Sequence, residues 1–160
     1  MIKSKGQGFV FGLIMSYAMA IGMEIYNMAI NFGGFDAMNY HVLVEAFKEA
    51  LYMGLFVLLF SYLWGNKIGE RFMEKHTTKQ DSPYIRQLLR QAGTVSIMCP
   101  TMSMVATILF QIVMGGQSVM ALIPLFIGTL LKNFPMAFFW NMFAAAPLTH
   151  WLFEKIFVRN

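Results

Sequence analysis

Hydrophobic residues form two long blocks along the chain, and one polar run over residues 65–90 separates them. The apolar stretches within the blocks have the length of a membrane-crossing helix, which is roughly 20 residues. We therefore predict four membrane-spanning helices, within residues 8–32, 42–64, 92–114 and 133–152. The double glycines Gly33-Gly34 and Gly115-Gly116 follow the first and third stretches and predict that those helices end there. The predicted fold class is an all-α membrane protein of two helical hairpins.

Two local signals refine this pattern. The sequence Asp81-Ser82-Pro83 places a capping residue before a proline, which predicts a helix that begins at Pro83 and runs into the third span. The last apolar block, residues 119–157, is too long for one straight crossing. We expect residues 119–131 to form a partly interfacial lead-in to the fourth span.

The composition excludes several classes of protein. The chain of 160 residues is 58% hydrophobic and 12% charged, whereas soluble domains carry about 25% charged residues. Its net charge of +4 comes from basic residues beside apolar spans, where they contact anionic head groups, so we expect membrane lipids rather than nucleic acid as partners. The single cysteine, Cys99, precludes an intramolecular disulfide. The small size suggests a homo-oligomer.

Basic residues also predict the orientation. They precede the first span and follow the fourth, while the loops at residues 33–40 and 115–118 contain none. Because cytoplasmic loops are enriched in Lys and Arg, we expect both termini and the connector on the cytoplasmic side of the cell membrane. Lys3 and Lys5 before an apolar run that contains Ala18-Met19-Ala20 imitate a secretory signal, but the run continues to Phe32, so we expect an uncleaved span. The connector carries Lys67, Arg71, Lys75, Lys79, Arg86 and Arg90.

The two halves of the chain look like copies of one hairpin. Ile14 to Met19 align with Ile97 to Met102, and the double glycines then coincide within one residue. Further along, Phe47-Lys48-Glu49 align with Leu131-Lys132-Asn133, and Ile68 aligns with Leu152. These matches predict a first hairpin repeat over 1–76, a cytoplasmic linker over 77–85 and a second repeat over 86–160. Both repeats enter and leave on the same side, so they are expected to be parallel.

The motifs resemble domain-of-unknown-function family 2798, a small bacterial two-helix membrane domain. The resemblance is carried by Met-Ser/Cys-x-x-Met in the first helix of each hairpin, the run Lys132 to Phe138, and Ala146-Pro147. The first half has Leu51 and Leu63 where the second half has its prolines. The resemblance implies an integral bacterial membrane protein and brings no known activity.

A second resemblance is to the bacterial transmembrane-pair efflux proteins. Those proteins carry an acidic residue in the first helix and Trp-Asn motifs in the second helix of each pair, which match Glu24 and Trp140-Asn141. The basic-residue–histidine start of their first helix is absent here. The efflux function is therefore not carried over from this resemblance.

Glu24 is the strongest candidate for a functional residue. Placing an ionisable group inside an apolar span costs free energy, and such a group normally faces the interior of the helix bundle. Small and polar residues recur on its helix face at Ser16, Ala20, Asn27 and Asn31. The second repeat aligns Cys99, Ser103 and Thr107 with this stripe, with Gln111 nearby. One interpretation is close helix packing through small and polar groups. The other is a proton or cation site at Glu24.

Three further residues complete the candidate ion-coupling or substrate set. Lys48 and Lys132 hold equivalent positions near the outer ends of the second and fourth spans, and Asn141 lies in the fourth. Hairpin geometry brings Glu24 level with about residue 48, so either lysine could form an ion pair with it. Alternatively, both lysines extend to the head groups on their long stems, or Lys48 pairs locally with Glu45 or Glu49.

The sequence gives no strong indication of metal binding or catalysis. Met15, Met19 and Met23 form a stripe that could bind copper(I), but methionine is also an adaptable packing residue, and we expect no metal and no cofactor. No arrangement of residues indicates catalysis, so we expect no enzyme. Two hypotheses of function follow: a small ion-coupled transporter or efflux protein that uses Glu24, or a non-transporting assembly or regulatory partner of other membrane proteins.

Overall fold

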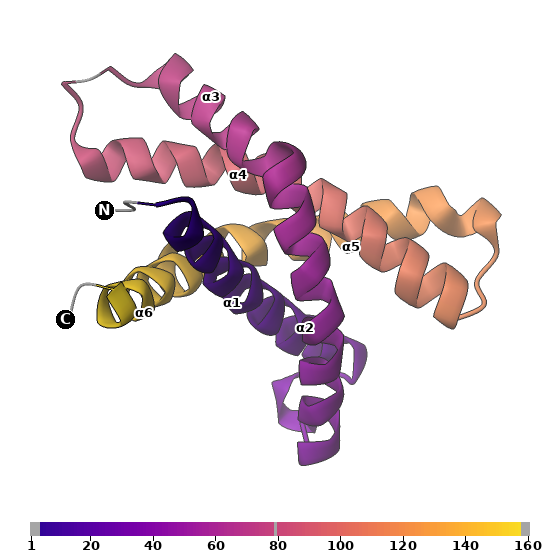
Figure 1. Ribbon diagram of the computed structural model, residues 1–160. Coiled ribbons are helices and arrows are strands. Elements are labelled where there is room, and N and C mark those ends of the chain that lie inside the picture. Colours follow the sequence, from indigo (N-terminus) through magenta and orange to yellow (C-terminus); the bar gives the residue numbers. More distant parts are fainter. Residues whose placement is uncertain (1–3, 79, 158–160) are drawn as a thin grey trace. The chain divides into compact units, whose positions relative to one another are not determined.

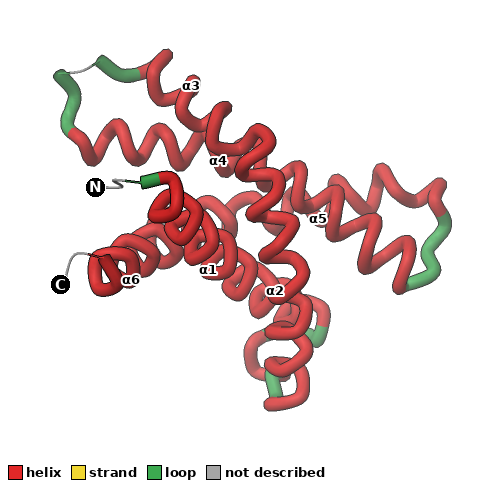
Figure 2. The backbone as a smooth tube through the Cα atoms, in the orientation of Figure 1, coloured by secondary structure: helices red, strands yellow, loops and turns green. Residues whose placement is uncertain are grey.

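The computed structural model describes residues 4–78 and 80–157, and every element within them is helical (Figure 2). The all-α fold class predicted from the sequence is therefore confirmed. The elements are α1 (Lys5–Asn31), the 3-10 turn η1 (Phe35–Ala37), α2 (Tyr40–Phe60), η2 (Ser61–Gly65), α3 (Asn66–His76), α4 (Pro83–Ala106), η3 (Thr107–Met114), the 3-10 turn η4 (Val119–Ala121), α5 (Leu122–Trp140), η5 (Asn141–Ala145) and α6 (Ala146–Phe157).

The helix ends lie where the local signals predict them. Ser82 caps α4 by accepting a hydrogen bond from the backbone N–H of Ile85 at 3.3 Å, and Pro83 is the first helical residue. The helix α1 ends at Asn31, before Gly33 and Gly34 with φ of 96° and 128°. Such positive φ values are accessible to glycine without steric cost, so the double glycine ends the helix as expected. Gly116 has the same role after η3, with φ of 65°.

Among residues 4–78 and 80–157, three helical stretches are long and apolar enough to cross a membrane: Lys5–Asn31, Pro83–Met114 and Val119–Phe157. They cover the predicted first, third and fourth spans, and the proposed lead-in is part of the same 39-residue stretch as the fourth. The predicted second span, 42–64, is helical too but is not one of these three. Its first half carries the charged residues Glu45, Lys48 and Glu49.

Within the part of the chain that the structure describes, three segments of the long helices are π-helical, with one more residue per hydrogen-bonded turn than an α-helix: η2, η3 and η5. Pro147 gives a physical reason for η5, because proline has no N–H and its ring clashes with the carbonyl four residues earlier, at Phe143. A wider turn over Asn141–Ala145 accommodates that clash. No proline lies within Ser61–Gly65 or in the turns that follow it, since the next proline is Pro83, so the cause of η2 is different.

The chain forms two compact units whose boundaries fall inside the two longest helical stretches. Unit 1 contains Met1–Leu59 and Phe139–Asn160, and unit 2 contains Phe60–Phe138. The stretch from α2 to α3 leaves unit 1 near η2, and the stretch from α5 to α6 returns to unit 1 near η5. Both π-helical segments therefore lie where the chain passes from one unit to the other.

Unit 1 is built around α1, which packs between α2 and the C-terminal helix. The hydroxyl of Tyr17 donates to the carbonyl of Leu51 at 3.2 Å, and Met28 packs against Val42 and Ala46. On the other side, the ring centroids of Phe11 and Phe153 lie 5.5 Å apart. Residue numbers fall along α1 as they rise along its partners, so both pairs are antiparallel. Figure 1 shows α1 beside α6.

Unit 2 is built around α4. Glycines allow α3 to approach it closely, since a Cβ on Gly69 would overlap the Thr94 hydroxyl and one on Gly93 would lie 2.6 Å from the Cβ of Phe72. The indole N–H of Trp64 donates to the Thr101 hydroxyl at 3.4 Å. The continuation of α4 into η3 meets α5 through Thr129. Figure 1 shows α3 alongside α4.

Candidate functional site

Glu24 lies on the packed face of α1, and only 3% of its surface is exposed. The helical periodicity of α1 places Ser16 and Ala20 on the same face, and both are buried. This stripe is the small and polar face that the sequence predicts. The fold therefore removes one carboxyl group from solvent inside a helix of membrane-spanning length.

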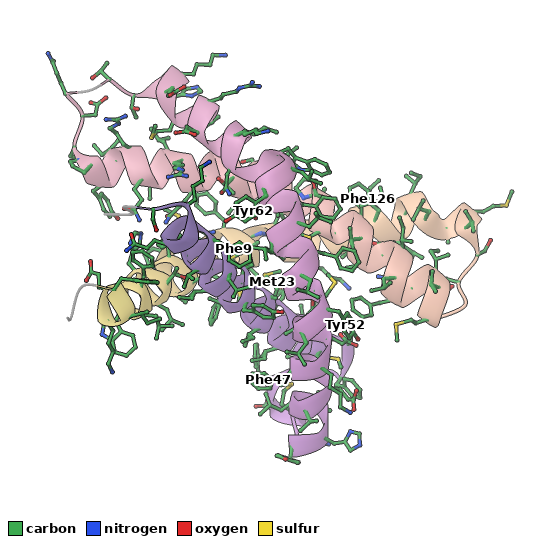
Figure 3. All side chains as sticks on the ribbon, in the orientation of Figure 1. Phe9, Met23, Phe47, Tyr52, Tyr62 and Phe126 are labelled. Atoms are coloured by element: carbon green, nitrogen blue, oxygen red, sulfur yellow. The ribbon has the colours of Figure 1, made fainter. Side chains whose placement is uncertain are left out.

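The surroundings of this carboxyl group are short of positive charge. The side-chain amide of Asn27 donates a long hydrogen bond of 3.5 Å to Glu24 Oε2. Across the hairpin, Glu49 of α2 is its repulsive electrostatic neighbour, and Tyr52 lies close enough to interact with both acids. Among the described residues, none of these interactions is with a basic side chain. Met23 and Tyr52, labelled in Figure 3, mark the parts of α1 and α2 in which Glu24 and Glu49 lie.

Lys48, a sequence candidate for pairing with Glu24, has a local partner. Its Nζ atom lies 2.6 Å from Glu45 Oε1, one turn earlier on α2, and the side chain is exposed. This is the local alternative that the sequence left open. Asn31, the outermost residue of the predicted stripe, is exposed at the last position of α1. Of the stripe's polar members, Glu24 and Asn27 are thus brought together.

Asn141 enters unit 1 from the C-terminal helix, through the π-helical segment η5. Its amide Nδ2 donates to the sulfur of Met19 at 3.6 Å, while its buried Oδ1 accepts no hydrogen bond from the described residues. Its neighbour Trp140 donates from the indole N–H to the carbonyl of Ala18 at 2.9 Å. The Trp-Asn pair noted in the sequence therefore docks the C-terminal helix onto α1, between one and two turns before Glu24.

Thr107 and Lys132 belong to unit 2. Thr107 is completely buried, and its hydroxyl lies 2.7 Å from the carbonyl of Ser103 and 3.4 Å from the hydroxyl of Thr129. Gln111 donates to the same Thr129 hydroxyl at 3.1 Å. This network is uncharged. Lys132 is exposed on α5.

Two sulfur atoms of the methionine stripe, those of Met15 and Met19, contact polar groups of the C-terminal helix. Met19 accepts from Asn141. The Met15 sulfur lies 3.4 Å from the hydroxyl of Thr149, which donates to the carbonyl of Ala145 at 2.6 Å. Within residues 4–78 and 80–157, no group of three or more His, Cys, Asp or Glu side chains could hold a metal ion. The contacts of Met15 and Met19 are those of packed side chains between two helices.

Sequence reasoning missed four members of these sites: Tyr52, Thr129 and Thr149, and the place of Glu49 beside Glu24. The hairpin register that brought Glu24 level with residue 48 could have drawn attention to Glu49, the next residue. Thr129 and Thr149 gave no such signal, because a single hydroxyl within an apolar run does not reveal its partner.

No family model matches the chain, and no curated protein or solved structure matches it at a significant level. The resemblance to family 2798 stays a prediction from its motifs.

Proposed function

We propose that this chain is an integral protein of the bacterial cytoplasmic membrane with four spans and both termini in the cytoplasm. Three apolar stretches of sufficient length support the proposal, and the helix over 42–64 supplies the fourth crossing. The connector lysines and arginines support the orientation, because the opposite loops, at residues 33–40 and 115–118, carry no basic residue.

Within that membrane, we propose a small ion-coupled transporter in which Glu24 is the coupling group. The observation that carries this proposal is a buried carboxyl group whose described interactions include no basic side chain. Burying a charge without a partner is costly, so such groups neutralise or bind a counter-charge. A proton or a small monovalent cation supplies that charge. The side-chain amide of Asn27 can hydrogen-bond to Glu24 both when the carboxyl group is neutral and when it is charged.

The neighbouring acid Glu49 strengthens the case. Two carboxyl groups that repel each other across α1 and α2 favour the uptake of positive charge between them. Lys48 does not neutralise the pair directly, because its Nζ atom contacts Glu45. Uptake and release of one positive charge at Glu24 would then be the step that couples to a cationic substrate.

The second candidate function is a non-transporting assembly or regulatory partner, in which Glu24 is structural. The hydrogen bond from Asn27 is compatible with this function, because it needs only an oxygen acceptor at position 24 and not a charge. A glutamine there could accept the same bond. Small buried residues of α1, such as Ala20 and Gly22, are also typical of close helix packing in membranes.

One substitution separates the two functions. Wild type and Glu24→Gln would be expressed at matched levels in a host that lacks its own efflux pumps, and accumulation of a panel of lipophilic cations would be measured. We expect the wild type to lower accumulation of at least one compound and Glu24→Gln to abolish that effect. Glu45→Gln is the matched control, because it removes a carboxylate of the same region that is already paired with Lys48.

The outcomes are distinct. No effect of the wild type on any compound would contradict the transport of lipophilic cations. An effect that persists in Glu24→Gln would assign the residue a structural role instead.

A further inference from the structure

The contacts inside unit 1 recur inside unit 2 at positions that the repeat alignment makes equivalent. The alignment that places Ile14 over Ile97 also places Met15 over Met98 and Phe11 over Thr94. The alignment that places Ile68 over Leu152 also places Gly65 over Thr149 and Gly69 over Phe153. Two alignments, derived from sequence alone, therefore link positions on the first and second helices of the two repeats.

In unit 1, Met15 of α1 meets Thr149 of α6, with 3.4 Å between the sulfur and the hydroxyl oxygen. In unit 2, the equivalent residues meet as well, since a Cβ on Gly65 would lie 2.7 Å from the sulfur of Met98. In the first pair the methionine contacts the hydroxyl of Thr149, and in the second it packs against the bare backbone of Gly65. Both bring the same part of a first helix against the same part of a second helix.

The next pair of contacts, about one turn along, repeats the correspondence. Phe11 stacks edge-on against Phe153, with 5.5 Å between ring centroids. Their equivalents are Thr94 and Gly69, and a Cβ on Gly69 would overlap the Thr94 hydroxyl. The side chains differ completely, from two large rings to a hydroxyl over a glycine. The recurrence is therefore one of backbone position rather than of residue type.

We propose that the two hairpin repeats exchange the second halves of their long helices. In unit 1, the first helix of repeat one packs against the second half-helix of repeat two, α6. In unit 2, the first helix of repeat two, α4, packs against the second half-helix of repeat one, α3. Each unit thus contains one hairpin and the second half-helix of the other repeat. The packing surface of each first helix is complementary to that half-helix.

The π-helical segments η2 and η5 fit this arrangement, because they lie where the two long helices leave their own hairpin. Local π-helical turns change the direction of the side chains that follow them, which re-aims the second half of the helix. The exchange also means that neither repeat buries its first helix fully by itself. It rests on the internal repeat and not on the role of Glu24, so the two proposals stand or fall separately.

Disulfide trapping in the full-length protein tests the exchange. Cys99→Ala removes the native thiol, and a protease recognition sequence between Lys79 and Gln80 lets the two halves be separated after oxidation. The exchanged pairs are Met15→Cys with Thr149→Cys, and Gly65→Cys with Met98→Cys. Each would join the first half of the chain to the second, so we expect both variants to keep the full-length band after cleavage under non-reducing conditions.

The matched controls recombine the same four substitutions, as Met15→Cys with Gly65→Cys and Met98→Cys with Thr149→Cys. These pairs would be close if each half-helix occupied the equivalent place on its own repeat. A disulfide within one half cannot hold the two halves together, so the control pairs are read by labelling with a thiol-reactive maleimide after oxidation, and we expect both of their thiols to remain free. The exchange is overturned if the recombined pairs form the disulfide within a half, if neither exchanged pair forms, or if the exchanged pairs link only two copies of the chain. Comparable detergent-extracted yields of the four variants would confirm that they fold equally.

Discussion

The aromatic ring of Trp140 occupies the space above Gly22 in which a side chain would begin. A Cβ on Gly22 would overlap the indole ring, while the indole N–H donates to the carbonyl of Ala18 at 2.9 Å. This pair docks the C-terminal helix onto α1 within unit 1. The contact depends on a residue without a side chain on one helix and on the largest side chain on the other.

Gly22→Ala is expected to destabilise the protein by about 1–3 kcal/mol, because the added methyl group overpacks this contact. Gly128→Ala is the matched control, since Gly128 lies within α5 and a Cβ there would meet nothing within 4 Å. The control should be neutral or stabilising by up to about 1 kcal/mol, the helix propensity of alanine over glycine. Thermal unfolding in detergent measures both, and equal effects would contradict the packing role of Gly22.

Trp140→Leu should relieve part of the strain that Gly22→Ala introduces, because the shorter side chain leaves room for the methyl group. In a double-mutant cycle, we expect the double variant to be more stable than the sum of the single effects by at least about 0.5 kcal/mol. Additive effects would mean that the two residues are not in contact.

Thr107→Val is expected to destabilise unit 2 by about 0.5–1.5 kcal/mol, because it removes the hydroxyl that lies 3.4 Å from Thr129 and leaves a buried network incomplete. Ser96→Ala is the comparison, since the Ser96 hydroxyl donates at 2.8 Å to a carbonyl of its own helix and is exposed. The thermal midpoint of both variants should be measured at the same detergent concentration. An effect of Ser96→Ala as large as that of Thr107→Val would argue against the interhelical role.

The turn before α4 should loosen in acid. Two hydrogen bonds from Thr78, first from its backbone N–H at 2.6 Å and then from its hydroxyl at 3.1 Å, hold the pKa of Asp81 below its ordinary value. A lowered pKa in the folded state means that the stabilisation is present above the unfolded pKa of about 4 and is lost as pH falls through the folded value.

Hydrogen exchange of the Thr78 amide, measured relative to its intrinsic rate, reports that change. Protection should decrease below about pH 4 in the wild type, where the carboxylate takes up its proton. In Asp81→Asn the protection should be low and insensitive to pH over the same range. A wild-type profile as flat as that of the variant would refute the role of the carboxylate.

Topology reporters should place the chain ends and loops on opposite sides of the membrane. Because basic residues cluster beside the termini and in the connector, a reporter after Arg159 should be active in the cytoplasm. One inserted between Gly115 and Gly116 should be active outside, since that loop carries no basic residue. Cytoplasmic activity at both sites would exclude the proposed four-span topology.

The candidate site shows where sequence reasoning is strong and where it fails. Glu24 could be singled out because an acid in an apolar helix is rare, whatever the fold around it. The hairpin register could also have pointed to Glu49, the residue after Lys48. The approach of Tyr52 could not be predicted, because it depends on the rotation of α2 against α1. The local pairing of Lys48 with Glu45 was one of several open choices, and only the side-chain geometry selects it.

The sequence by itself determined the helical class, most helix ends and the long apolar stretches. These features depend on local physics: glycines that adopt positive φ, a proline after a capping serine, and runs of apolar residues. The tertiary structure decided which helix packs against which, including the division of two long helices between the units. The physical reason is that apolar helices of similar composition offer similar burial to many partners. The choice between them depends on shape, as where the bare backbone of Gly22 receives the ring of Trp140.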